Sequence, residues 1–377
     1  MNRFLLFILT VLTFLSSCGT RKKDAPQGKE GREIKFAYAQ NIRMTAYEGY
    51  MRVVLLDPWK KGKTLHTYYL INKEGVHPKG NGTEIDVPLR RMVVFTTAHA
   101  NLMEWLQAGN QIAGVADARY MLIPDVQQRL GKKGAKNAIA DCGNSMNPNV
   151  ERIIDLRADA VLVSPFENSG GYGALDKTGI PLIECADYME TSALGRAEWM
   201  RFYGRLVGRG QEADSLFRVV ERKYKRLSAL AKKSKDRKSV IPERKIGSVW
   251  YLPGGKSSTG LLYRDGNIGY AFASDGHSGS LALPFETVLD KAGEADVWLM
   301  SYNGTMNKRM LLDEFSGYQQ LKAFKEGHIY GCAVDKKPYF EEVSWRPDWL
   351  LRDLLVIFHS TLQGSLGTQL RYYQLIK

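Results

Sequence analysis

The stretch NPNVERIIDLRADAVLVS, residues 147–164, decides the fold, because a short amphipathic helix leads there directly into a buried strand. Asn147 is a residue type that caps helix N-termini and Pro148 suits the first helical position, so we expect a helix from Pro148 to about Arg157. The apolar run from Ala160 to Ser164 predicts a strand that is buried on both faces. A helix followed by such a strand is typical of α/β domains with a parallel sheet.

The same helix–strand unit occurs a second time further along the chain. Residues 151–155 (ERIID) correspond to residues 286–290 (ETVLD), and residues 158–164 (ADAVLVS) correspond to residues 295–301 (ADVWLMS). The repeat predicts two related lobes. It also places one glutamate, Glu151 or Glu286, near the start of a helix at an equivalent position of each lobe.

A long helix is predicted between the two repeated units. Apolar residues recur at helical spacing from Ala213 to Ala231, and a helix of about 20 residues spans roughly 30 Å at 1.5 Å per residue. A shorter amphipathic helix that carries Trp199 and Tyr203 precedes it. We therefore expect an N-terminal lobe over residues 34–194, connecting helices over 195–235 and a C-terminal lobe over 236–377.

Shorter elements complete the α/β pattern of strands that alternate with helices. Helices are expected at residues 98–106 and 123–130, and strands at residues 34–38, 51–56, 66–70, 92–95, 112–115, 181–185 and 246–251.

The first twenty residues have the features of a bacterial export signal. Arg3 precedes an apolar run from Phe4 to Leu15, which at about a dozen residues is too short to span a bilayer comfortably. The segment Leu15-Ser-Ser-Cys18 resembles the lipobox of bacterial lipoproteins, in which the cysteine is acylated. We expect a signal peptide over residues 1–17, lipidation at Cys18 and a flexible tether over residues 18–33. The expected location is the periplasm, with the chain held at a membrane by its lipid.

The composition favours anionic partners, because the formal net charge is +13 and the isoelectric point is near 9.4. No basic stripe with interleaved aromatic residues is present, so nucleic acid is not an expected partner. Beyond Cys18 the chain has Cys142, Cys185 and Cys332, and whether two of them form a disulfide stays open. The cysteines and histidines have no metal-ligand spacing, so we expect neither a metal site nor a resident cofactor.

Several segments together resemble the substrate-binding proteins of ABC importers for iron siderophores, haem and cobalamin. The resemblance extends from about residue 34 to residue 362 and is carried by residues 91–106, 112–117, 147–162, 179–183, 194–204, 325–330 and 346–354. It implies two Rossmann-like α/β lobes joined by one long helix, with a ligand cleft between them. It also implies that Glu151 and Glu286 dock onto arginines of a membrane permease. We expect a monomer that delivers an iron chelate, haem or cobalamin to that permease.

The ligand cleft is expected at the loops that leave the carboxyl ends of the strands. Aromatic side chains there suit a large apolar ligand, and arginines suit an anionic chelate or a propionate. For each aromatic residue the alternative is that it packs beneath its own loop. The expected ligand-binding residues are His99, Arg119, Tyr120, Phe166, Tyr188, Tyr251, Tyr302, Trp345 and Arg346. Trp250 ends an apolar strand and is expected in the core.

The leading prediction is a binding protein without catalysis. A hydrolase would need a nucleophile elbow such as GxSxG, and the segment Gly276-His-Ser-Gly279 does not have that spacing. A second alternative is a lipoprotein that captures haem or a corrinoid without serving a permease.

Overall fold

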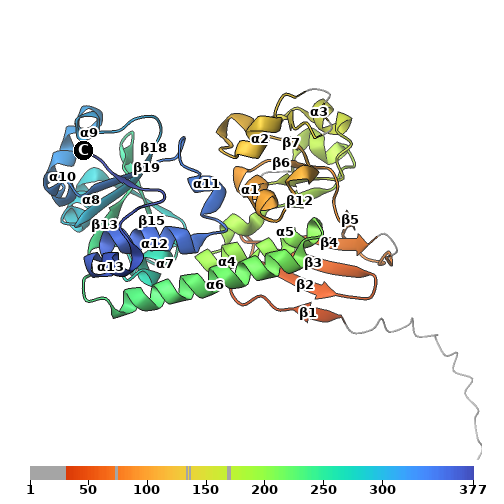
Figure 1. Ribbon diagram of the computed structural model, residues 1–377, viewed down its shortest axis with the longest axis horizontal. Coiled ribbons are helices and arrows are strands. Elements are labelled where there is room, and N and C mark those ends of the chain that lie inside the picture. The colour runs from red at the N-terminus through yellow and green to blue at the C-terminus, as the bar shows by residue number, and fades with distance from the viewer. Residues whose placement is uncertain (1–30, 73–74, 133–134, 136, 168–170) are drawn as a thin grey trace, which may run out of the picture.

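The computed structural model describes residues 31–72, 75–132, 135, 137–167 and 171–377. The predicted signal peptide, Cys18 and most of the tether lie outside these residues. The described chain forms two α/β lobes joined by one long helix, which confirms the predicted fold class (Figure 1). Among the described residues, no helix combines the length and the apolar character that crossing a membrane requires.

The N-terminal lobe is built on a parallel five-stranded sheet with the strand order β12-β11-β6-β7-β8. Apolar side chains cover both faces: Met92 and Val94 of β6 point into the main core, whereas Val93 joins a smaller core on the opposite face. This two-sided burial explains why the strands are short continuous apolar runs. The strands are β6 (Met92–Val94), β7 (Ile112–Val115), β8 (Ala140–Asp141), β11 (Ala160–Val163) and β12 (Leu182–Glu184), and the helices are α1 (Thr97–Trp105), α2 (Pro124–Arg129) and α3 (Val150–Asp155).

The helix of the opening stretch begins two residues later than the sequence predicted. Asn149 is the N-cap of α3, and its side chain accepts a hydrogen bond from the backbone N–H of Arg152 at 2.9 Å. Asn147 and Pro148 instead form strand β10, which pairs with β9 (Gly143–Asn144). The prediction was wrong because helix-capping preferences do not show that these two residues pair with the segment just before them in a short hairpin.

The C-terminal lobe has a mixed five-stranded sheet with the order β16-β13-β18-β19-β20. A three-stranded antiparallel sheet, β14-β15-β17, lies beside it. The strands are β13 (Ser239–Pro242), β14 (Lys245–Ile246), β15 (Val249–Pro253), β16 (Gly269–Tyr270), β17 (Ser280–Pro284), β18 (Val297–Tyr302), β19 (Ile329–Ala333) and β20 (Gln374–Leu375), and the helices are α7 (Ser258–Asp265), α8 (Phe285–Ala292), α9 (Lys308–Glu314), α10 (Lys322–Glu326), α11 (Tyr339–Glu342), α12 (Pro347–Phe358) and α13 (Gln363–Leu366).

The expected single strand over residues 246–251 is a hairpin. Gly247 adopts a φ of 59°, in the left-handed region that favours glycine, and the chain turns there between β14 and β15.

The internal repeat occupies equivalent places in the two lobes. α3 leads to β11, which pairs in parallel with β6, the first strand of its sheet along the chain. α8 leads to β18, which pairs in parallel with β13, again the first strand of its sheet along the chain. Glu151 and Glu286 each occupy the second position of their helix, and both are exposed.

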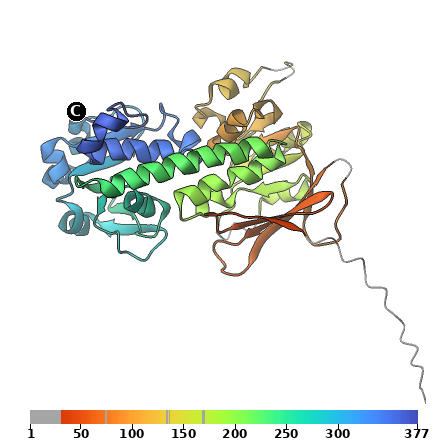
Figure 2. The same cartoon turned by 60° about the horizontal axis from the view of Figure 1, so that its bottom comes forward.

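Three consecutive helices connect the lobes: α4 (Ala193–Glu198), α5 (Met200–Leu206) and α6 (Gly210–Lys233). α6 has 24 residues and runs from the N-terminal lobe to the C-terminal lobe (Figure 2). It buries one stripe, which includes Ala213, Phe217, Val220, Tyr224 and Ala231, as the sequence pattern predicts.

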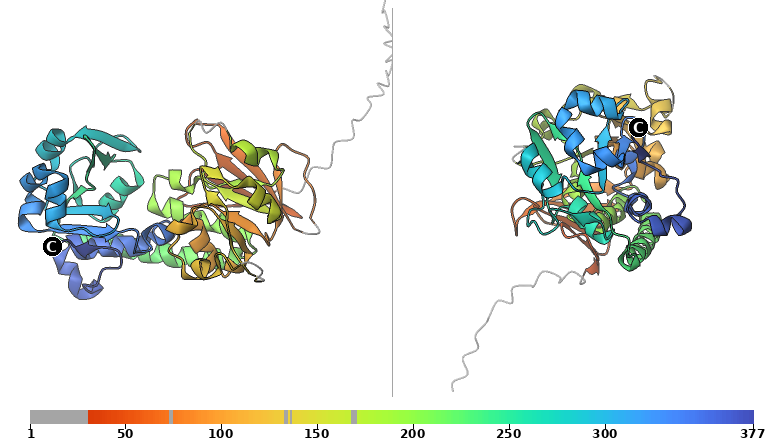
Figure 3. Two further views of the ribbon diagram at one scale, coloured as in Figure 1. Left: turned by 90° about the horizontal axis from the view of Figure 1, so that it is seen from above. Right: turned by 90° about the vertical axis from the view of Figure 1, so that its left-hand side faces the viewer.

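A second connection crosses between the lobes in the opposite direction. α11 follows the last parallel strand of the C-terminal lobe but packs on α1 of the N-terminal lobe. The buried Glu341 carboxylate accepts hydrogen bonds from the Thr97 hydroxyl at 2.7 Å and the Leu122 N–H at 2.8 Å. The indole N–H of Trp345 donates to the Ala98 carbonyl at 2.6 Å. Viewed from above, the connections between the lobes lie along one edge of the molecule (Figure 3).

A separate sheet precedes the N-terminal lobe, with the strand order β1-β2-β3-β4-β5. Its strands are β1 (Arg32–Ile34), β2 (Ile42–Ala46), β3 (Tyr50–Leu56), β4 (Thr64–Asn72) and β5 (Thr83–Val87). We call it the N-terminal sheet. The expected strand over residues 34–38 is wrong, because residues 35–41 form a loop that binds the connecting helices instead.

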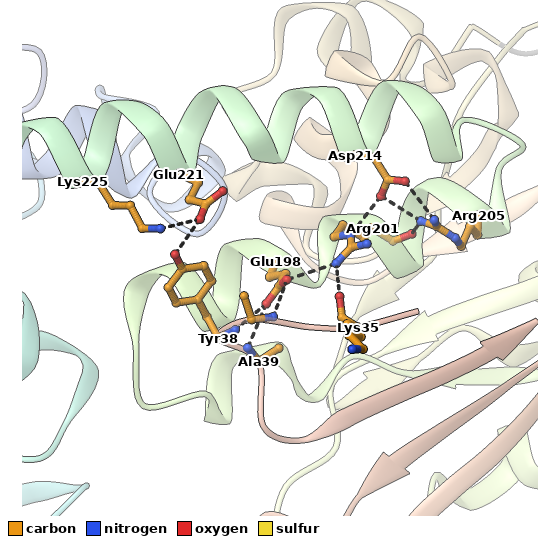
Figure 4. Close-up of polar contacts among 10 residues, drawn as sticks. Lys35, Tyr38, Ala39, Glu198, Arg201, Arg205, Asp214, Glu221 and Lys225 are labelled. Atoms are coloured by element: carbon orange, nitrogen blue, oxygen red, sulfur yellow. Dashed lines mark hydrogen bonds and ion pairs between the residues drawn. The ribbon is translucent and has the colours of Figure 1, made fainter. Parts of the chain in front are cut away.

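Two buried carboxylates hold this loop. Glu198 of α4 accepts the backbone N–H groups of Ala37, Tyr38 and Ala39 at 2.9, 2.8 and 3.0 Å. Glu190 accepts the N–H groups of Gln40 and Asn41 at 3.0 and 2.8 Å. The network continues to α6, where the Tyr38 hydroxyl donates to Glu221 at 2.6 Å (Figure 4).

The question of a disulfide is settled for the described residues. Cys142, Cys185 and Cys332 are all buried there as free thiols.

Candidate functional site

A cavity of about 340 Å³ lies where the N-terminal lobe meets α11, and we call it the junction cavity. Its N-terminal wall comes from the carboxyl ends of parallel strands, the start of α1 and α4, and the facing wall comes from α11 and the segment after it. The lining residues are Thr96, Thr97, Ala98, His99, Ser164, Cys185, Asp187, Tyr188, Arg196, Phe340, Val343 and Ser344. Carboxyl ends of strands are where α/β folds place their ligands.

Arg196 is the exposed charge of this cavity, with 32% of its side chain accessible. Its Nε donates to Asp187 Oδ2 at 3.2 Å. Its two terminal nitrogens have no hydrogen-bond partner among the described residues. The guanidinium is therefore fixed at one end and available at the other.

Asp187 is fully buried and joins three hydrogen-bond donors. Its Oδ1 accepts from His99 Nε2 at 2.9 Å and from the Tyr203 hydroxyl at 2.8 Å, while its Oδ2 accepts from Arg196. Burial alone would raise the pKa of Asp187, but His99 and Arg196 hold that pKa below its ordinary value. The carboxylate therefore stays ionised and orients Arg196.

His99 lies in the first turn of α1, with only 3% of the residue exposed. Burial alone would lower its pKa, but the interactions with Cys185 and Asp187 raise it to about 10. Its other ring nitrogen is hydrogen-bonded to the Thr96 hydroxyl. His99 was expected on a loop of the ligand cleft, and it lines the junction cavity from α1. Both of its ring nitrogens, however, are already hydrogen-bonded within the protein.

Two further cavities border this region. One of about 200 Å³ lies where the N-terminal sheet, the N-terminal lobe and the C-terminal lobe meet. It is lined by Gln40, Asn41, Pro58, Tyr188, Met189, Glu190, Thr191, Ser258 and Ser278. Tyr188 lines both this cavity and the junction cavity. The other, of about 340 Å³, lies within the N-terminal lobe and includes Phe166 in its lining.

The structure leaves five of the predicted ligand residues at the surface. Tyr188, Phe166, Tyr251 and Tyr120 are 38%, 46%, 47% and 60% exposed. Arg119 stacks on the Tyr120 ring at 4.5 Å, on the turn after β7. Of these residues only Tyr188 lines the junction cavity.

Three predicted ligand residues are buried and bonded within the protein. Tyr302 is 3% exposed and its hydroxyl accepts a hydrogen bond from Gln374 at 2.6 Å. Trp345 is fully buried against α1. Arg346 is 8% exposed and binds Asp348 through two hydrogen bonds of 2.8 and 2.7 Å. These assignments to the cleft surface are corrected. Tyr302 is the last residue of β18, Trp345 and Arg346 lie between α11 and α12, and the polar groups of all three find partners within the protein. Trp250 is buried, as predicted.

The residues that sequence reasoning missed are Arg196, Asp187 and Phe340. Arg196 was assigned to a connecting helix, and it does lie in α4, but there its side chain lines the junction cavity. Phe340 is 54% exposed and lines the junction cavity from α11. A search of strand ends could not have indicated Arg196 or Phe340, because these two residues lie in helices.

The model of the family described as "Periplasmic binding protein" matches residues 93–335. The N-terminal sheet lies before this range. An uncharacterized lipoprotein of Methanocaldococcus jannaschii is 26% identical over 348 residues, which cover 85% of this chain and 81% of the relative.

Solved structures with a similar fold include two periplasmic binding proteins. The periplasmic heme-binding protein RhuT from Roseiflexus sp. RS-1 has a TM-score of 0.57 at 18% identity, and the similarity covers 73% of this chain and 99% of that one. The periplasmic vitamin B12 binding protein BtuF of Vibrio cholerae has a TM-score of 0.52 at 11% identity, with coverage of 75% and 99%.

Proposed function

The chain belongs to the periplasmic binding protein family, and from that premise we propose that it is the substrate-binding component of an ABC importer for an iron chelate, haem or cobalamin. The observation that carries this proposal is the family match over both lobes, together with a cavity at their junction. The relatives named above support the ligand classes, because one binds heme and another binds vitamin B12. The protein would bind and deliver its ligand without catalysis.

We further propose that a lipid on Cys18 holds the protein at a membrane in the periplasm. The segment Leu15-Ser-Ser-Cys18 supports this, as does the name lipoprotein given to the Methanocaldococcus jannaschii relative. Metabolic labelling with a tagged fatty acid, compared between the natural chain and Cys18→Ala, tests the anchor. Equal labelling of the two chains would refute it.

Ligand binding is tested by tryptophan quenching and by thermal shift against haemin, cyanocobalamin and ferric siderophores. The expected result is saturable binding of one class. A chain that responds to none of these probes would overturn the proposed function.

Glu151 and Glu286 are proposed to dock onto basic residues of the permease. Both are exposed at the second position of a helix, and neither forms an ion pair within the part of the chain that the structure describes. Exposed salt bridges contribute about 0–1 kcal/mol each, so the two would set register and orientation more than affinity.

Exposed aliphatic side chains beside these glutamates support a docking surface. Met146 and Ile154, near Glu151, are 73% and 50% exposed. In the C-terminal lobe, Ile246 is 70% exposed and pairs with Val249, which pairs in turn with Pro284 just before α8. Paired residues share one face of a sheet, so this aliphatic row leads toward the helix start that bears Glu286.

The repeat provides a matched test of docking. Glu151→Arg with Glu286→Arg is expected to abolish uptake through the permease, while ligand binding persists. Asp155→Arg with Asp290→Arg makes the same charge change at the other end of the same helices and should leave uptake intact. If both double variants transport normally, docking through Glu151 and Glu286 is refuted.

A further inference from the structure

The junction cavity has one available charge, and that charge is positive. Among its lining residues the ionisable side chains are His99, Asp187 and Arg196, together with the Cys185 thiol and the Tyr188 phenol. The Asp187 carboxylate is already hydrogen-bonded to His99, Tyr203 and Arg196. Glu341 lies behind the wall, where Thr97 and Leu122 bind its carboxylate. No carboxylate of this wall is therefore free to receive a cation.

Arg196 is prepared for bidentate binding of an oxyanion. The hydrogen bond of its Nε to Asp187 fixes the plane of the guanidinium. An arginine whose orientation is fixed in advance loses less conformational entropy when it binds a carboxylate through its remaining nitrogens.

The walls around Arg196 are apolar and aromatic. Phe340 and Val343 line the cavity from the C-terminal segment, and Tyr188 lines it from the N-terminal lobe. The Tyr188 hydroxyl donates to the Pro165 carbonyl at 2.5 Å, so its ring is held in place. A fixed ring beside a charge suits an anionic group that is carried on a flat apolar body.

The size of the cavity limits which part of a ligand it holds. At about 340 Å³ it is near the lower end of the range of roughly 300–1,000 Å³ for small-molecule sites. It therefore suits one arm of a large chelate. The neighbouring cavity that shares Tyr188 is lined by polar residues that include Gln40, Asn41, Ser258 and Ser278. The Glu190 carboxylate also lines it, but this carboxylate already accepts hydrogen bonds from Gln40, Asn41 and Trp199, so the cavity suits uncharged polar groups.

We infer that the ligand is an anionic chelate, and that Arg196 binds one of its carboxylates, or an equivalent oxyanion, in the junction cavity. This rests on the proposed function and narrows its ligand class. It excludes cationic chelates as the preferred ligand and makes Arg196 a determinant of charge selectivity.

The test compares three probes of different charge on the full-length protein. Haemin carries two carboxylates, cyanocobalamin has uncharged amide side chains, and ferrioxamine B carries a positive charge. Affinities are measured by tryptophan quenching at two salt concentrations. The natural protein is expected to bind haemin more tightly than ferrioxamine B, and the difference should shrink at high salt.

Variants at one position identify the contact. Arg196→Met should weaken haemin binding about 10–100-fold, as the loss of one charge-assisted hydrogen-bonded pair implies. Arg196→Lys should retain part of the affinity, because lysine keeps the charge but loses the planar fork. Arg218→Met removes an exposed arginine from α6 and serves as the control. Circular dichroism and thermal unfolding check that each variant is folded.

The outcomes separate the inference from the function on which it rests. Tighter binding of ferrioxamine B or cyanocobalamin than of haemin would overturn the inference and leave the proposed function standing. Unchanged haemin affinity in Arg196→Met would overturn it as well. If the natural protein binds none of these three probes and none of the other ferric siderophores that test the proposed function, that function fails, and the inference fails with it.

Discussion

Glu198→Gln is expected to detach the N-terminal sheet from the connecting helices. One carboxylate oxygen accepts from Tyr38 and Ala39, and the other accepts from Ala37 and from Arg201 at 3.1 Å. Glutamine replaces one oxygen with an NH2 group, so two of these four hydrogen bonds are lost whichever way the amide turns. The NH2 group of the glutamine would also face the two N–H donors that have lost their acceptor.

The size of the effect follows from these contacts. Hydrogen bonds to a charged group contribute about 1.5–3 kcal/mol each, so losing two should lower the free energy of unfolding by about 3–6 kcal/mol. Glu198 is only 1% exposed, which leaves little room for water to replace the lost acceptor. If the sheet opens separately from the rest of the protein, the loss appears as local opening.

Urea unfolding and hydrogen exchange together measure both outcomes. Unfolding is followed by intrinsic fluorescence, and exchange is followed at the amides of residues 37–39. Glu212→Gln is the control, because Glu212 forms an exposed ion pair with Arg209 at 3.2 Å. Such pairs contribute about 0–1 kcal/mol. The reasoning is refuted if Glu198→Gln costs no more than the control and amide exchange at residues 37–39 does not accelerate.

Three further predictions concern the packing of the two lobes. Because the folded protein raises the pKa of His99 from its ordinary 6.5 to about 10, the stabilising contribution of His99 is complete below pH 6.5 and is lost as the pH rises toward 10. Over this interval the free energy of unfolding should fall more steeply in the natural protein than in His99→Gln. Parallel plots of the free energy of unfolding against pH for the two proteins would contradict the prediction. Trp345→Phe removes a buried hydrogen bond between α1 and the segment after α11 and should cost about 2 kcal/mol in urea unfolding, whereas a loss below about 0.5 kcal/mol would show that the bond contributes little. Gly255→Ala would place a Cβ within 2.7 Å of three backbone carbonyls and should destabilise the protein by about 1–3 kcal/mol or more. Gly276→Ala is the control, because its Cβ would meet nothing within 4 Å. Equal melting temperatures of the two variants would refute the predicted clash.

Local patterns in the sequence predicted the regular elements well. The strand Ile112–Val115 was predicted with its bounds, and the buried stripe of α6 follows the periodicity of its apolar residues. Such patterns are reliable because burial of one face is a property of residues near one another in the chain. The repeat at Glu151 and Glu286 also occupies equivalent places in the two lobes, since a helix and the strand after it form one local unit.

The residues of the candidate site were predicted less well. Tyr302 is the last residue of β18 and Trp345 lies between α11 and α12, and both side chains are buried in the core. Arg196 is a site residue on a helix, where a search of strand-end loops does not look. Whether a loop side chain faces a cavity or the core depends on what packs against it, and that partner comes from a distant part of the chain.

The sequence by itself determined the class of the protein: two α/β lobes, a long connecting helix and one exposed glutamate at the start of a helix in each lobe. Only the tertiary structure decided the charge of the cavity between them. His99 and Asp187 are 88 residues apart, and no spacing along the chain indicates that they meet. Their contact holds a carboxylate ionised in the core, and that carboxylate turns Arg196 toward the cavity. Periodicity determines which residues are buried, whereas the pairing of buried charges depends on which elements the fold brings together.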